Sequence, residues 1–125
     1  MERIMLYVDD TPGMPTTIAW SLKLARSMSC RLIALSVIDP AAPRRRESPS
    51  TDVEERAWSL LYEIEDDAFQ QNVRISLLLE PGEPLGRLVS LSSSYEAELI
   101  VVSADCRLTI TELVRQSSRP VVFVK

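Results

Sequence analysis

The chain has 125 residues, of which 46% are hydrophobic and 26% charged, with a net charge of −4 and no histidine. This balance predicts one globular domain over residues 1–125, and it excludes a disordered chain or a broad basic face for nucleic acid. Without histidine, Ser-His-Asp and Cys-His catalysis and the histidine-containing zinc motifs are excluded as well. No apolar stretch is long enough to span a bilayer, so we expect no membrane contact and a cytoplasmic location.

The first half of the chain predicts strands and helices in alternation. The apolar run Ile4–Val8 ends at two aspartates and is typical of a buried parallel strand. Apolar residues at helical spacing then predict a helix from about Pro15 to Ser29, followed by a second buried strand over Leu32–Ile38. A loop rich in proline and serine comes next. An apolar stripe from Val53 to Ala68 predicts a long helix after that loop.

The second half continues the same alternation. A third strand is predicted over Val73–Leu79, and a helix begins at Pro84, where a missing N–H costs nothing. A fourth strand over Leu99–Val102 precedes a short helix from about Thr109 to Arg115 and a final strand over Val121–Val124. Strands and helices that alternate in this way predict an α/β fold with a parallel sheet covered by helices on both faces.

The polar residues that end these strands are the candidate site. Ligands of such sheets bind beyond the carboxyl ends of the strands, where the strand order reverses. The residues expected there are Asp9, Asp10, Thr11, Val37 to Asp39, and Ser103 to Asp105. Acids at strand ends also commonly cap turns and helices, so a capping role, a small-ligand contact and a metal contact all stay open for Asp9 and Asp10.

Four segments carry a pattern that no single motif carries alone. They are Arg3–Thr11, Ala25–Pro40, Gly82–Val102 and Arg119–Val124. In their order and spacing they resemble the universal stress protein family. The resemblance implies an open five-stranded parallel sheet in the order 3-2-1-4-5, of the flavodoxin-like or adenine nucleotide alpha hydrolase-like kind. It also implies a homodimer joined through the last strand, at Val121, Val122, Phe123 and Val124.

One branch of that family binds ATP through a glycine-rich loop, G-x2-G-x9-G-[ST], between the fourth strand and the last. In this chain the interval from Ser103 to Arg119 contains no glycine. Aspartates 9, 10 and 105 are expected around the same crevice, and their charge opposes a triphosphate. We therefore expect no cofactor, with ATP and AMP disfavoured. The residues left for any nucleotide are Val8, Asp9, Thr11, Val37 and Ser103.

Three function classes follow from these observations. The leading interpretation is a non-enzymatic stress-response or regulatory module that works as a homodimer with an unidentified protein partner. The alternative is a small-ligand protein that holds an adenine nucleotide in the shortened crevice. A third class is a magnesium-dependent hydrolase that uses Asp9 and Asp10. Receiver domains of response regulators also carry an acidic pair there, but the third strand here ends at Leu79-Glu80, without their phosphoacceptor aspartate.

Other conspicuous residues have simple interpretations. Cys30 and Cys106 are far apart and form no CxxC motif, so we expect reduced thiols that pack, with redox sensing at Cys106 as the alternative. The triplet Arg44-Arg45-Arg46 is either a solvated loop tip or a contact for a phosphate or a partner.

Overall fold

The computed structural model describes residues 1–41 and 50–125, so the predictions for Arg44-Arg45-Arg46 fall outside the described residues. Within those ranges the strands are β1 (Arg3–Tyr7), β2 (Arg31–Ile38), β3 (Ile75–Pro81), β4 (Leu99–Ser103) and β5 (Val121–Val124). They form one sheet in the order β3-β2-β1-β4-β5, and every neighbouring pair is parallel. The predicted fold class and strand order are confirmed.

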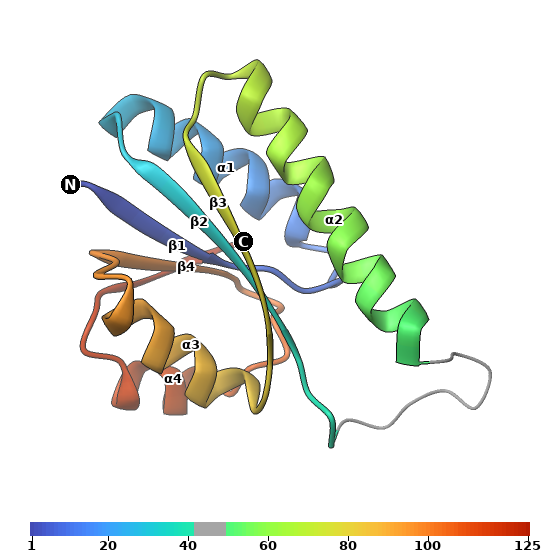
Figure 1. The fold of residues 1–125 in the computed structure, drawn as a ribbon. Coiled ribbons are helices and arrows are strands. Elements are labelled where there is room, and N and C mark those ends of the chain that lie inside the picture. The colour runs from blue at the N-terminus through green and yellow to red at the C-terminus, as the bar shows by residue number, and fades with distance from the viewer. Residues whose placement is uncertain (42–49) are drawn as a thin grey trace.

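Helices cover both faces of the sheet (Figure 1). α1 (Met14–Met28) and α2 (Ser50–Gln70) lie on one face, and α3 (Pro84–Ser94) and α4 (Ile110–Gln116) lie on the other. None of the helices described over 1–41 and 50–125 is long and apolar enough to cross a membrane.

The central position of β1 in the sheet explains why its sequence is apolar without interruption. Its side chains alternate between the two faces, so Ile4 and Leu6 join the core beneath α1 and α2, while Met5 and Tyr7 join the core beneath α3 and α4. Both faces are therefore dry, and Ile4, Met5 and Leu6 are fully buried. A continuous hydrophobic run is what such a strand requires.

β3 lies two residues later than the sequence predicts. The strand runs over Ile75–Pro81 rather than Val73–Leu79, because Val73 belongs to the turn that ends α2. Asn72 adopts a left-handed conformation (φ 58°), and the Val73 N–H donates to the Ala68 carbonyl in a helix-ending turn. At the other end Pro81 pairs with Ile38, which an edge strand tolerates because proline lacks only an N–H.

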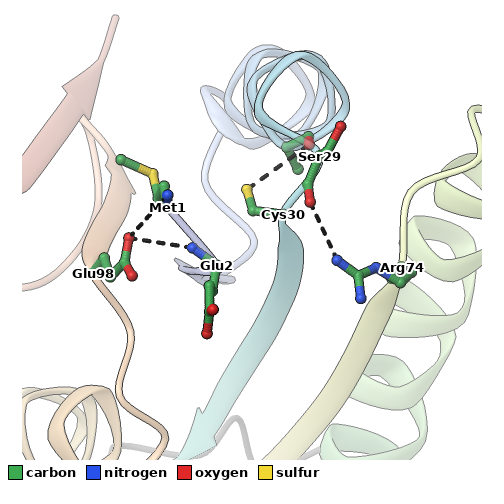
Figure 2. Close-up of polar contacts among 7 residues, drawn as sticks. Met1, Glu2, Ser29, Cys30, Arg74 and Glu98 are labelled. Atoms are coloured by element: carbon green, nitrogen blue, oxygen red, sulfur yellow. Dashed lines mark hydrogen bonds and ion pairs between the residues drawn. The ribbon is translucent and has the colours of Figure 1, made fainter.

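The amino ends of the strands are tied together by a separate set of polar contacts (Figure 2). α1 is followed by its C-cap residue Ser29, which has a left-handed backbone (φ 52°), and then by the buried Cys30. The Arg74 guanidinium donates to the Ser29 carbonyl (3.2 Å), and the Glu2 N–H donates to the Glu98 carboxylate (3.2 Å). These contacts satisfy groups at the end of the sheet that lies away from the candidate site.

Candidate functional site

Asp9 organises the turn that leads from β1 into α1. Its Oδ1 accepts hydrogen bonds from the Thr11 hydroxyl (2.7 Å) and from the Thr11 N–H (3.3 Å). The Met14 N–H donates in turn to the Thr11 carbonyl (3.1 Å). An aspartate that bonds to the backbone two residues on is a common turn builder. Asp9 therefore has the structural role of starting α1, in addition to its place at the strand end.

Asp105 reaches the same turn from the loop after β4. The Gly13 N–H donates to its Oδ2 (2.9 Å), and the buried Ser103 hydroxyl donates to its Oδ1. Gly13 is the N-cap residue of α1, so the carboxylate lies against the amino terminus of a helix, where negative charge is favoured. The Ser103 hydrogen bond, helped by the one from Gly13, holds the pKa of Asp105 below the usual carboxyl range.

Gly13 is required by this close approach. Its φ of −78° is ordinary for any residue, so conformational freedom is not the reason for glycine. A Cβ at this position would lie 2.6 Å from Asp105 Oδ1 and would also overlap the Ser103 hydroxyl. Only glycine leaves room for the serine and the carboxylate beside the start of α1.

Arg107 contacts both aspartates that follow β1. Its N–H donates to Asp9 Oδ2 (3.4 Å), and its guanidinium pairs with Asp10 Oδ1 (2.8 Å). The Arg107 and Asp10 side chains are 71% and 75% exposed, so water screens this ion pair and it adds little stability. Asp10 thus points into solvent, while Asp9 and Asp105 flank the turn. Among the described residues no group of three acidic or cysteine side chains could hold a metal ion.

The five residues predicted for nucleotide binding come from the ends of three strands and from both faces of the sheet. Asp9, Thr11 and Ser103 come together at the ends of β1 and β4. Val8 and Val37 lie on opposite faces of the sheet, since Val8 is buried in the core beneath α1 and Val37 packs against the core beneath α3 and α4.

Neither the Cys106 thiol nor the Tyr7 hydroxyl, which both lie near Asp9, is activated as a nucleophile. Burial raises the pKa of the Cys106 thiol, and the charges of Asp9 and Asp105 raise it further. Burial likewise raises the pKa of the Tyr7 hydroxyl, again with a contribution from Asp9. Both groups are therefore protonated at neutral pH, which favours a packing role for Cys106 over a reactive one.

The sequence did not reveal two of the groups that shape this site. The backbone N–H groups of Gly13 and Arg107 hold the carboxylates of Asp105 and Asp9. A glycine just before a predicted helix was the available signal for the first contact. Nothing in the sequence indicates the second, because backbone donors carry no residue signature.

Comparison with known proteins agrees with the fold and identifies the family. The model of the universal stress protein family matches residues 1–125. The chain belongs to the universal stress protein family. Comparison with curated protein sequences gives no significant match.

Solved structures of the family have the same fold at low sequence identity. A universal stress family protein from Burkholderia pseudomallei is 20% identical, with a TM-score of 0.81 over 98% of this chain and 95% of its own. One from Archaeoglobus fulgidus, in complex with dAMP, is 18% identical, with a TM-score of 0.77 over 100% and 98%. One from Arabidopsis thaliana, with AMP bound, is 16% identical, with a TM-score of 0.73 over 100% and 92%.

Proposed function

We propose that this chain is a non-enzymatic stress-response or regulatory module, cytoplasmic, that acts through protein contacts and does not bind ATP. The observation that carries the proposal is the hydrogen bond from the Gly13 N–H to the Asp105 carboxylate at the start of α1. A helix N-terminus with free N–H groups is a natural phosphate site. In this chain the Asp105 carboxylate already accepts a hydrogen bond from that N–H group, and its negative charge lies at the same place.

The charges around the turn support the same conclusion. Asp9 and Asp105 both accept hydrogen bonds from backbone N–H groups, and backbone N–H groups are the donors that phosphates use at helix starts. The cation of the turn, the Arg107 guanidinium, is paired with Asp10. A triphosphate at this place would displace two carboxylates or lie beside them. The glycine-free interval from Ser103 to Arg119 offers no flexible backbone to replace the lost donors.

The experiment is an equilibrium titration of the full chain with labelled ATP and magnesium, followed by a measurement of phosphate release. We expect no saturation at micromolar concentrations and no magnesium-dependent hydrolysis. Saturable micromolar binding would contradict the proposal. Turnover that disappears in Asp9→Asn would instead establish a hydrolase.

A second candidate is the binding of an adenosine monophosphate at the same strand ends. It is favoured by the family members with bound dAMP and AMP, whose folds this chain shares. A monophosphate carries less charge than ATP and needs fewer donors, so Asp9, Thr11 and Ser103 remain as contacts. A thermal-shift comparison of AMP with ATP separates the two candidates, since this one requires stabilisation by AMP alone.

We also propose that the chain forms a homodimer through β5. The strand lies at the edge of the sheet, its four residues are half-buried, and it carries no charged side chain. Exposed apolar edge strands normally need a cover or a partner. Light scattering at micromolar concentration should then give a mass near twice 14.1 kDa.

A further inference from the structure

The opposite edge of the sheet also has unpaired backbone. β3 pairs with β2 alone among the described strands. The Leu32 N–H donates to the Arg74 carbonyl and the Gly82 N–H to the Ile38 carbonyl, so even-numbered residues of this segment face β2. The N–H and carbonyl groups of Ile75, Leu77 and Leu79 therefore point away from the sheet.

Few features of this edge would prevent another strand from pairing with β3. The Arg31 guanidinium approaches the Ile75 carbonyl (3.4 Å), but the N–H groups of Leu77 and Leu79 have no hydrogen-bond partner among the described residues. From Ile75 to Leu79 the strand carries no charged residue and no proline, the usual devices that block an edge. An extended peptide can add to such an edge by main-chain hydrogen bonds.

A hollow of about 310 Å³ lies at the amino end of β3. It is lined by Glu65, Asp66 and Phe69 of α2 together with Val73 and Ile75. Val73 is buried and Ile75 half-buried, whereas Phe69 is 83% exposed and its ring makes an apolar wall. The two carboxylates belong to the helix beside that wall. The hollow thus combines an apolar surface with acidic groups.

The charge of α2 gives this hollow a preference for cations. Helices end in a negative dipole, which basic residues normally offset. The last turn of α2 has no basic residue, and neither does that of α3, whereas α1 carries Arg26 and α4 carries Arg115 in the same position. Arg74, close by in sequence, donates to the Ser29 carbonyl (Figure 2). The carboxylates of Glu65 and Asp66 thus lie near the negative end of the helix.

We propose that the β3 edge and this hollow form a docking surface for an extended segment of another protein that carries lysine or arginine. The main chain of the segment pairs with Leu77 and Leu79. The aliphatic stem of its basic side chain lies on Phe69, and the charged head reaches Glu65 and Asp66. Long basic side chains are suited to such a site because they combine an apolar stem with a charged end. The aromatic ring adds a cation–π contact.

The test is a titration of the isotope-labelled full chain with a short blocked peptide of alternating valine and threonine that carries one central arginine. We expect amide shifts at Ile75, Leu77 and Leu79, and slower hydrogen exchange at Leu77 and Leu79. The matched peptide with glutamate in place of arginine should bind at least about fivefold more weakly. Equal binding of the two peptides, or shifts confined to other strands, would overturn the proposal.

Variants separate the side-chain part of the surface from the backbone part. The double change Glu65→Gln and Asp66→Asn should weaken the arginine peptide by roughly fivefold, while Glu63→Gln, an exposed acid of the same helix outside the hollow, should not. Leu77→Pro removes one outward N–H and should abolish the exchange protection at Leu79. Protection of β3 in the free chain that rises with protein concentration would assign the edge to a second copy, against the proposal.

Discussion

The carboxylate of Asp105 accepts a hydrogen bond from the N–H of Gly13 (2.9 Å), a residue 92 positions earlier in the chain. The contact joins the loop after β4 to the first turn of α1, and the buried Ser103 hydroxyl holds the carboxylate from the other side. An acid from one part of the chain thereby satisfies a backbone donor at the start of a helix in another part.

Gly13→Ala should destabilise the protein. The added Cβ would lie 2.6 Å from Asp105 Oδ1, so Ser103 and Asp105 must move and their hydrogen bonds lengthen. Overpacking of this kind costs about 1–3 kcal/mol, measured as the free energy of unfolding in urea. Gly86→Ala is the matched control, because its Cβ would meet only the end of the flexible Glu83 side chain, 3.0 Å away. A control variant as unstable as Gly13→Ala would refute the steric explanation.

The pKa of the Asp105 carboxyl should lie below the ordinary range, since Ser103 and Gly13 donate hydrogen bonds to its charged form. A carboxyl whose pKa is lowered on folding stabilises the fold above its unfolded-state pKa, and the contribution is lost as the pH falls through the folded-state pKa. Wild type should therefore exceed Asp105→Asn in stability at neutral pH, and the difference should close below about pH 4. Carboxyl NMR titration measures the pKa directly, and an ordinary value would contradict the assignment.

Cys106 should react slowly with iodoacetamide at neutral pH. Burial and the charges of Asp9 and Asp105 raise the pKa of this thiol, so the reactive thiolate is scarce. Cys30, which is 2% exposed, should react more slowly still. Mass spectrometry of the native chain against the urea-unfolded chain measures both rates. Faster labelling of Cys106 in the native state would revive a redox role.

Val121→Pro should convert the proposed dimer to a monomer. The Ile100 N–H donates to the Pro120 carbonyl and the Ala104 N–H to the Val124 carbonyl, so the Val121 N–H points away from β4. Proline at the first position of an edge strand leaves the existing ladder intact. Light scattering gives the mass and circular dichroism the fold. Leu77→Pro on the opposite edge is the matched control and should stay dimeric. Loss of the dimer in both variants would point to general destabilisation.

Glu83→Ala should remove the cap of α3. The Glu83 carboxylate accepts from the N–H groups of Leu85 (3.2 Å) and Gly86 (2.5 Å), which are among the first unpaired donors of the helix. Loss of an N-cap side chain costs about 1 kcal/mol, measurable by urea unfolding. Glu83→Asp keeps a carboxylate at the cap and should lose less. An unchanged stability of Glu83→Ala would show that the cap contributes nothing.

The fold could be predicted because its signals are local and repeated. β1 and β4 are apolar on both sides, α1 and α2 show helical stripes, and Pro84 begins α3 as expected. The predicted start of β3 is wrong because Val73 is as apolar as the strand that follows. Its place is decided by the left-handed turn at Asn72, and asparagine, which adopts this conformation more readily than most residues, was the available signal.

The candidate site was predictable only in outline. Asp9, Thr11 and Ser103 were placed correctly at strand ends, since topology alone determines which ends are neighbours. Asp10 points into solvent beside Arg107 while Asp9 bonds to the turn, and no sequence pattern distinguishes the two adjacent aspartates. The cap at Glu83 was missed for a related reason, because aspartate, asparagine, serine and threonine are the usual caps and glutamate is rare there.

The strand order places β3 and β5 at opposite edges of one sheet. A dimer closed through β5 by a two-fold axis uses that edge in both copies and leaves one β3 edge at each end. Such a dimer would be a bivalent receptor for the basic segments proposed to dock at β3. Two weak contacts on one partner, or on a partner that is itself dimeric, would then combine into avidity without any new contact surface.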